Sequence, residues 1–347
     1  MKIVLITPSN TLFMPYLNNY TELLDDYQID YDVINWNRFQ MEETHPYVFK
    51  DHKVGHQRNF IDYVRYRYFI KKILRENHYD KVIVFGLQLV YFLRRLLRKN
   101  YDGNFAVDIR DHNDILNYFT LAPIVEGAEF VALSSRGFME WLPLSTKYII
   151  SHNTTFEAIP YAPKVSFKDD LITIGYIGSI RDYYVNIQLI DQLKNNEYYL
   201  LNYHGEGHAN QAIIKYIEEH DIQNVTLTGR YLKNDELGFY TSNDIINLLR
   251  DETDIYSRTA LPNRLYNAVI VGRPLLVFSG TYLSEIVERY QLGLLIDRIE
   301  TVEAKLQDYI KTFDYDAFVK GRQQFFDVVV EENQLFAECL KAFVTQA

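Results

Sequence analysis

The feature that most constrains the fold of this chain is a repeated alternation between short β-branched runs and segments with helical periodicity. The runs are apolar along their whole length, which is typical of parallel strands that are buried on both faces. Strands that alternate with helices predict an α/β fold with parallel sheets and crossover helices. The predicted strands are Lys2–Thr7, Tyr31–Ile34, Lys81–Phe85, Phe105–Ile109, Phe130–Ser134, Tyr148–Ser151, Ile172–Ile177, Tyr199–Tyr203, Val225–Thr228, Asp244–Leu248 and Pro274–Phe278.

The alternation falls into two series, and we expect each to form one doubly wound, Rossmann-like domain, because 347 residues exceed the usual size of one core. Residues 153–170, between the series, contain two prolines and no clear period, which indicates a linker. The predicted domains are residues 1–155, residues 169–310, and a helical tail over 311–347 that packs back towards the N-terminal domain. The two domains are expected to face a cleft at the carboxyl ends of their strands.

Composition excludes several classes of protein. With 48% hydrophobic and 24% charged residues the chain is globular, and its net charge of −10 disfavours nucleic acid as a partner. Cys339 is the single cysteine, so internal disulfides are excluded and a reducing, cytoplasmic compartment is expected. The apolar run at the start predicts a strand rather than a signal peptide, and no run is long enough for a transmembrane helix.

Two glycine-containing turns follow strands of the second series. In the turn Gly178-Ser179-Ile180-Arg181, glycine would let backbone N–H groups approach a phosphate, and the arginine would add a charge-assisted hydrogen bond to a diphosphate. Gly205 lies in the second turn, between His204 and His208. Ordinary tight turns explain both segments equally well, and two histidines without a third ligand make a weak metal site.

The most informative segment is a helix predicted to begin near Pro262 and to end at Gly272. Its N-terminus would offer unpaired N–H groups and the positive end of the helix dipole. We expect Arg258 and Arg264 at that same end. These features predict a binding site for an anion such as a diphosphate.

In the first domain, Asp111 and His112 follow a predicted strand end. A carboxylate and an imidazole there would orient an acceptor or shuttle its proton, although a structural pair between Asp108 and Arg110 is an alternative explanation. The segment Asp30-Tyr-Asp32 has the Asp-x-Asp spelling of a metal site, but it lies beside an early strand, where we expect a solvated position. We therefore predict no bound metal and no cofactor.

The order of these segments resembles that of the GT-B glycosyltransferases, family 4 in particular. The matching pieces of the second domain are GYIGSIR, YHGEG, NVTLTGRY, DIINLL, LPNRLYNAVIVGRPLLV and LSEIVERYQLGLLID. Those of the first domain are VDIRDHND, EGAEFVALSSRGFMEWL and KYIISHN. The resemblance covers most of the chain, and it implies transfer of a sugar from a nucleotide diphosphate sugar, with a UDP-linked donor expected.

The resemblance also implies roles for individual residues. Gly178 and Arg181 match the loop and the basic residue near the donor diphosphate. The segment Gly229-Arg230-Tyr231 matches the backbone beside the nucleotide base, and Pro262-Asn263-Arg264 matches the helix start near the phosphates and sugar. His112 matches a histidine that approaches the donor sugar.

Both glutamates that hold the ribose in the family are replaced here. Asn267 stands at the place of the second and Thr259 at the place of the first. A neutral amide still hydrogen-bonds a hydroxyl, but more weakly than a carboxylate does. A retaining or inverting outcome therefore stays open, and so do two other functions: a GT-B-like nucleotide-sugar epimerase, and a non-catalytic partner protein that binds sugar nucleotides.

Residues 53–99 are strongly basic, with 12 Lys or Arg against three acidic residues. Cationic amphipathic helices of this kind bind anionic membrane surfaces, although two ordinary helices with solvated faces are an alternative explanation. On the membrane interpretation, the protein is peripheral on the inner face of the cell membrane. Its acceptor would be a glycan or a lipid-linked oligosaccharide in surface polysaccharide or capsule synthesis. Whether the chain forms a homo-oligomer stays open.

Overall fold

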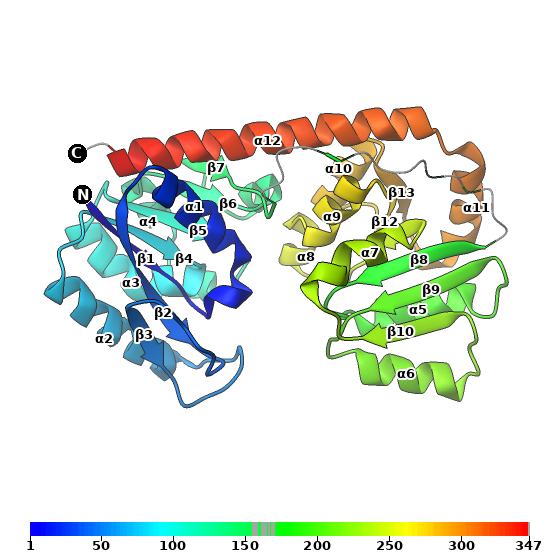
Figure 1. Ribbon diagram of the computed structural model, residues 1–347, viewed down its shortest axis with the longest axis horizontal. Coiled ribbons are helices and arrows are strands. Elements are labelled where there is room, and N and C mark those ends of the chain that lie inside the picture. The colour runs from blue at the N-terminus through cyan, green and yellow to red at the C-terminus, as the bar shows by residue number, and fades with distance from the viewer. Residues whose placement is uncertain (155–158, 161–164, 166, 168–170, 346–347) are drawn as a thin grey trace. The chain divides into compact units, whose positions relative to one another are not determined.

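The structure is a computed structural model that describes residues 1–154, 159–160, 165, 167 and 171–345 (Figure 1). The chain forms two compact units. The first comprises Met1–Thr155 with Glu331–Ala347, and the second comprises Phe156–Val330. Most of the predicted linker over 153–170, and the last two residues of the predicted tail, lie outside the described residues.

The first unit is built on a seven-stranded parallel sheet in the order β3-β2-β1-β4-β5-β6-β7 (Figure 1). The strands are β1 (Lys2–Ile6), β2 (Asp30–Asn37), β3 (Tyr47–Lys50), β4 (Lys81–Phe85), β5 (Phe105–Ile109), β6 (Val131–Leu133) and β7 (Tyr148–Ile150). The helices that precede the second unit are α1 (Asn18–Asp26), α2 (Phe60–Glu76), α3 (Leu87–Asn100) and α4 (Ala122–Gly127). The strand order reverses between β1 and β4.

The second unit repeats this plan with a six-stranded parallel sheet in the order β10-β9-β8-β11-β12-β13. The strands are β8 (Ile172–Ile177), β9 (Tyr199–His204), β10 (Val225–Gly229), β11 (Ile245–Asn247), β12 (Leu275–Phe278) and β13 (Gly293–Ile296). The helices are α5 (Tyr183–Leu193), α6 (Asn210–Glu219), α7 (Glu236–Thr241), α8 (Ile255–Thr259), α9 (Asn263–Val271), α10 (Tyr282–Arg289), α11 (Val302–Thr312) and α12 (Tyr315–Thr345). Here the order reverses between β8 and β11.

These two sheets confirm the predicted α/β class and the doubly wound architecture. The central strands are buried along their length, β1 and β4 in the first unit being examples, as expected for a sheet covered by helices on both faces. Two strands were not predicted: β3 and β13, which form one edge of each sheet. Each has four residues and is only partly buried, so neither carries the continuous apolar run of a central strand.

The long helix α12 belongs to both units. Its first part packs in the second unit, where Phe325 and Val329 are buried and Arg322 donates hydrogen bonds to the carbonyls of Val269 and Ile270 near the end of α9. Its last part lies in the core of the first unit through four buried apolar side chains, Phe336, Leu340, Phe343 and Val344. Despite its length, α12 is not apolar enough to span a bilayer, and neither is any other helix of the described residues.

Gly321 allows α12 to pack closely on the end of α10. A Cβ atom at this position would lie 1.7 Å from the carbonyl oxygen of Tyr290, so Gly321→Ala should lower the free energy of unfolding by about 1–3 kcal/mol through overpacking. The matched control is Gly238→Ala in α7, where a Cβ atom would meet nothing within 4 Å. Urea unfolding of both variants checks this, and equal stability of the two would show that α12 does not pack there.

Glu332 fastens the last part of α12 to the first unit. Its side chain, 9% exposed, accepts from Arg136 at 2.5 Å and pairs with His152 Nε2 at 2.6 Å. Burial acts to raise the pKa of Glu332, but His152 and Arg136 outweigh it and hold this pKa below its ordinary value. The charged form is therefore stabilising above the unfolded-state pKa, and this contribution is lost as pH falls through the lowered folded-state pKa.

Glu332→Gln should accordingly destabilise the protein by about 1–3 kcal/mol at neutral pH, since one buried charged contact is lost. The difference from the unchanged protein should shrink as pH falls below about 4, because Glu332 itself then becomes protonated. Chemical unfolding across this pH range provides the measurement. The neighbouring exposed Glu331→Gln carries the same charge change and should have no comparable effect. A pH-independent loss in Glu332→Gln would contradict the assignment.

Candidate functional site

The loops after β8 and β9 pack against each other beside the point where the strand order of the second unit reverses, which is between β8 and β11. Gly178 and Gly205 both have positive φ, at 115° and 130°. A Cβ atom on Gly205 would lie 2.0 Å from the carbonyl oxygen of Gly178, and one on Gly207 would lie 2.0 Å from that of Ile180. Gly205 and Gly207 are thus required by backbone contact between the loops, while a Cβ atom on Gly178 would meet open space.

Arg264, on the first turn of α9, is the charged centre of this region. Its guanidinium lies 3.9 Å from the ring centroid of Tyr176, and its Nη1 donates to the carbonyl oxygen of Asn247 at 2.8 Å, at the end of β11. Within the part of the chain that the structure describes, this half-buried arginine has no salt-bridge partner. A guanidinium at the edge of a parallel sheet that is not committed to a salt bridge is a suitable partner for an anionic ligand.

Two more arginines, Arg250 and Arg181, act together with Arg264 on the carboxylate of Asp182. Burial raises the pKa of Asp182, whereas Arg264, Arg250 and Arg181 each favour its charged form. The pKa of Arg250 is lowered by burial and then by repulsion from Arg264, so the two guanidiniums are close in space. Arg181 itself is exposed, and its Nε donates weakly to the hydroxyl of the exposed Ser179 at 3.4 Å. Arg181 and Arg264 therefore both lie within electrostatic reach of the Asp182 carboxylate.

The predicted helix start lies at the same edge. Pro262 is the N-cap of α9, and Asn263 is the first residue of the helix. The helix therefore begins one residue after the proline, where the sequence predicted its start near the proline itself. Arg250 donates to the carbonyl of Ser257 in α8 and to that of Ala260 in the connection between α8 and α9, and so holds the chain that leads into α9 in place. Arg258 belongs to the last turn of α8 rather than to the start of α9, and it is exposed.

A carboxylate lies beside Asn267, although the sequence analysis found none. Asn267 Nδ2 donates to Glu236 Oε1 at 3.0 Å, and Lys233 pairs with the other oxygen of the same carboxylate. The side chain of Glu236 is 13% exposed. Thr259, the other substituted position, is buried in α8 and donates to the carbonyl of Ile255. The acidic group of this region thus comes from α7, which no local spacing in the sequence indicates.

The segment Gly229-Arg230-Tyr231 follows β10. Gly229 has a φ of 72°, and Arg230 is largely exposed, with Glu206 at 3.4 Å as an ion-pair partner. Tyr231 packs its ring 5.2 Å from that of Phe239. Burial raises the pKa of Tyr231 to about 12, with Glu236 acting in the same direction and Arg264 against it. Tyr231, Glu236 and Arg264 are therefore neighbours.

Two buried polar atoms beside this cluster have no hydrogen-bond partner within the described residues: the hydroxyl of Tyr203 and Nε2 of His204. The Tyr203 ring stacks on Tyr176, under Arg264, and burial raises the pKa of the phenol. The imidazole of His204 stacks on Phe239 at 4.1 Å, and burial lowers its pKa. Unpaired buried donors and acceptors are costly, and they are common where a ligand completes a site.

In the first unit, the Asp108–Arg110 pair is structural. The guanidinium of Arg110 makes two 2.7 Å hydrogen bonds to the carboxylate of Asp108, and it also donates to the Ser151 carbonyl and to Asn153. Tyr20 donates to the same carboxylate at 2.7 Å. Apart from Asn153, every residue of this network is buried. The network therefore connects α1, β5 and the end of β7.

This network positions the two residues that follow it. Asp111 is exposed and acts electrostatically on Tyr16, whose ring lies 4.7 Å from Arg110. The His112 ring contacts Trp141 edge-on at 5.1 Å, and Asn113 caps the next helical turn. Asp111 and His112 therefore lie at the carboxyl end of β5, as predicted, with an exposed carboxylate next to a half-buried imidazole.

Asp32 of the Asp-x-Asp segment lies inside β2, where it pairs with Lys2 at 2.8 Å and accepts from Tyr79 at 2.6 Å. The carboxylate is thus part of the fold rather than a solvated position. No group of three His, Cys, Asp or Glu side chains among the described residues is arranged to hold a metal ion.

Several solved structures resemble this chain over almost its whole length. Sucrose-phosphate synthase from Thermosynechococcus elongatus matches with a TM-score of 0.68 and 14% identity, over 99% of this chain and 100% of that chain. A glycosyltransferase from Rickettsia africae matches with a TM-score of 0.65 and 10% identity, over 100% of this chain and 99% of that chain. Anabaena HepE, solved with UDP and glucose, matches with a TM-score of 0.59 and 13% identity. The match covers 99% of this chain and 100% of that chain. Neither a known protein family nor a curated protein matches by sequence. The likeness confirms the predicted GT-B fold.

Proposed function

We propose that the chain is a glycosyltransferase that moves a sugar from a nucleotide diphosphate sugar, with UDP as the favoured nucleotide, to a glycan or a lipid-linked acceptor. The observation that carries the proposal is the half-buried, unpaired Arg264 at the reversal of strand order in the second unit. HepE was solved in complex with UDP and glucose, which supports the choice of donor class.

In this proposal the second unit binds the donor. Arg264, the exposed Arg181 and the N–H groups at the start of α9 hold the diphosphate and stabilise the negative charge that develops on it as the sugar leaves. The arginines would then neutralise the leaving diphosphate, as a divalent metal does in other transferases, and the reaction would need no metal. The open space beside Gly178 leaves room for the phosphates.

Glu236 takes over the recognition of the ribose. Its carboxylate is oriented by Asn267 and Lys233, and each of its oxygens retains acceptor capacity for a hydroxyl. Asn267, which stands where the family has a glutamate, would position this carboxylate instead of replacing it. The aromatic pair of Tyr231 and Phe239 lies next to the same cluster and suits a nucleotide base.

The first unit would present the acceptor. Asp111 or His112 at the end of β5 would orient the attacking hydroxyl or take its proton, with Arg110 holding their loop. A surface polysaccharide or glycoconjugate built at the inner face of the cell membrane fits such an acceptor, and the protein would then be cytoplasmic and membrane-peripheral.

Incubation with a panel of nucleotide sugars tests the proposal against its rivals. Release of the nucleotide that depends on a glycan or glycolipid acceptor, with transfer of the sugar, supports it. Interconversion of the sugar without an acceptor would instead indicate an epimerase. Saturable binding without turnover, for every donor and acceptor tried, would indicate a sugar-nucleotide-binding partner protein. Turnover that resists chelators is expected, and a requirement for Mn²⁺ would contradict the arginine-based mechanism.

Arg264→Gln should weaken UDP binding at least tenfold, because a charged hydrogen bond to the diphosphate contributes about 1.5–3 kcal/mol. Isothermal titration at low salt measures the affinity, and a thermal melt verifies that the variant is folded. Arg289→Gln, an exposed arginine in the last turn of α10, serves as the matched control and should bind UDP normally. Unchanged affinity in Arg264→Gln would remove this residue from the site.

Glu236→Gln should reduce the preference for ribose over deoxyribose. In the unchanged protein, UDP should bind more tightly than 2′-deoxy-UDP, because the carboxylate accepts from the ribose hydroxyls. The variant should lose about fivefold or more in affinity for UDP and much less for 2′-deoxy-UDP. Asp235→Asn, its exposed neighbour, carries the same charge change and should leave the ratio intact. Equal losses for both nucleotides would rule out ribose recognition by Glu236.

A further inference from the structure

The basic stretch between residues 53 and 99 separates into two kinds of cation. Some are engaged within the first unit: Lys53 pairs with Asp62 at 2.5 Å, and Arg58 pairs with Asp51 at 2.7 Å. Lys72 pairs with Glu76, and Lys81 lies in β4, where its Nζ donates to the carbonyl of Phe343. The other cations lie along α2 and α3, which pack side by side through the stacked rings of Tyr63 and Phe92 at 5.1 Å. Only the second kind is available to a partner.

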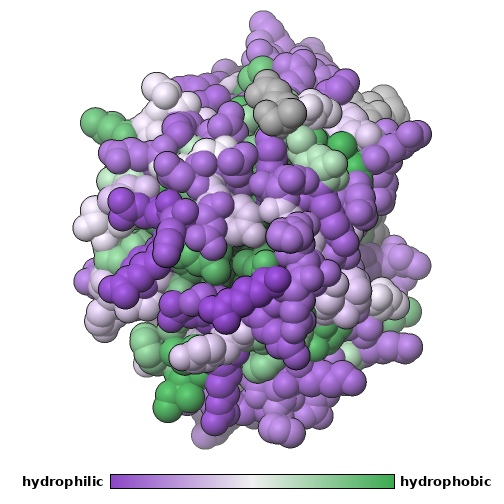
Figure 2. All heavy atoms as spheres, turned by 90° about the vertical axis from the view of Figure 1, so that its left-hand side faces the viewer, coloured by the Kyte–Doolittle hydropathy of each residue, from purple (hydrophilic) through white to green (hydrophobic). Residues whose placement is uncertain are grey.

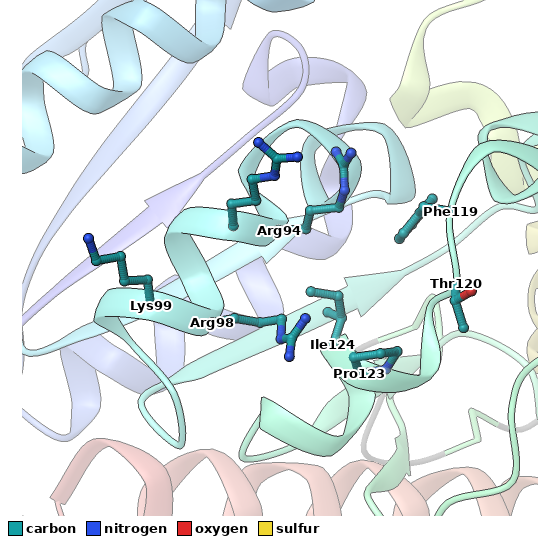
Figure 3. A pocket seen from close by; sticks show the side chains of 8 residues that line it. Arg94, Arg98, Lys99, Phe119, Thr120, Pro123 and Ile124 are labelled. Atoms are coloured by element: carbon teal, nitrogen blue, oxygen red, sulfur yellow. The ribbon is translucent and has the colours of Figure 1, made fainter.

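One hollow on this surface lies between α3 and the start of α4, together with the segment that leads into it (Figure 3). It has a volume of ≈ 500 Å³, with cations from α3 on one side and apolar groups such as Phe119 and Ile124 on the other. Figure 3 shows Arg98 directed from α3 towards Pro123 across this hollow. The cationic residues that line it are Arg94, Arg95, Arg98 and Lys99.

Two more hollows continue the same surface over the groove between α2 and α3. One, of ≈ 190 Å³, is lined by Phe60, Arg67 and Tyr91, among others. The other, of ≈ 330 Å³, adds Lys71 and Arg75 from α2. Arg95 lines all three hollows, so they adjoin one another, and no Asp or Glu lines any of them.

These cations lack anionic partners within the described residues. None of the seven along the groove forms a salt bridge there, in contrast to Lys53 and Arg58. The Nε atom of Arg67 is buried and has no hydrogen-bond partner in the described structure. The pKa of Lys71 is lowered by burial and then by the positive charges of Arg67 and Arg75. Like charges held close together without counter-charges favour a ligand with several phosphates.

Large apolar side chains accompany the charges. Phe60, which lines one hollow, and its neighbour Ile61 are each 60% exposed at the start of α2. Figure 2 shows this side of the molecule, where strongly hydrophilic side chains border a hollow with hydrophobic side chains at its floor. An exposed aromatic and an isoleucine beside a row of cations suit the boundary between lipid head groups and acyl chains better than they suit a fully hydrated polyanion.

We propose that the α2–α3 face of the first unit binds the surface of an anionic phospholipid bilayer, with head-group phosphates held in the three hollows and Phe60 and Ile61 inserted at the interface. The inference rests on the proposed function only where it connects this face to a lipid-linked acceptor. Binding to the bilayer is itself independent of the donor site in the second unit.

Sedimentation with phosphatidylcholine vesicles, with and without phosphatidylglycerol, tests the proposal. The full chain should bind only the anionic vesicles, and the affinity should fall as salt is added. Arg94→Gln, Arg95→Gln and Arg98→Gln combined should weaken this binding at least tenfold. The matched control combines Lys305→Gln, Lys311→Gln and Lys320→Gln, three exposed cations of the second unit with the same total charge change, and it should bind as the unchanged protein does.

A second variant separates the contribution of the inserted apolar side chains from that of the positive charges. Phe60→Ser combined with Ile61→Ser should weaken vesicle binding severalfold while keeping its salt dependence. Equal loss in the two triple variants, or no binding to anionic vesicles, would overturn the proposal. Binding of a single-stranded oligonucleotide in preference to vesicles would overturn it too, in favour of a nucleic acid. Because UDP affinity is measured on the same variants, failure of vesicle binding with normal UDP binding would refute this inference and leave the proposed function standing.

Discussion

The structure depends above all on the burial of two all-parallel sheets. Every strand runs in the same direction within its sheet, so all loops that follow strands gather at one edge. Where the order reverses, between β8 and β11, the loops diverge to either side, and polar groups can converge there without breaking the apolar core. The close backbone contact between the loops at Gly178 and Gly205 fixes the floor of this edge.

Among the described residues, Arg181, Arg250 and Arg264 form no salt bridge at this edge, although each acts electrostatically on the carboxylate of Asp182. Arg250 directs its hydrogen bonds to carbonyls of the chain leading into α9, whereas Arg264 rests on the face of Tyr176 with a single carbonyl partner. Stacking on an aromatic ring holds a guanidinium in position without neutralising it. A half-buried arginine without a salt-bridge partner among the described residues is costly, and an anion would relieve that cost. This cost is the physical basis for the proposed diphosphate site.

In the first unit, by contrast, the arginine at the strand ends is paired with a carboxylate. Arg110 is fully engaged by Asp108, Ser151 and Asn153, so it stabilises the loop and has little capacity left for a ligand. The cations that stay without counter-charges lie instead along the groove of α2 and α3. One unit therefore presents positive charge at its sheet edge and the other on a helical face, which are suited to different anions.

The sequence by itself determined the fold class, eleven of the thirteen strands that the described residues form, and the positions of the main loops, because continuous apolar runs and glycine turns are local signals. It also indicated Arg264 and Arg181, since residues that follow a parallel strand or begin a helix must lie at the binding edge. Only the tertiary structure revealed Glu236 beside Asn267, the unpaired Tyr203 and His204 atoms, and the division of the basic stretch into engaged and available cations. These features depend on contacts between segments distant in sequence, or on partners chosen by packing, and no local pattern encodes them.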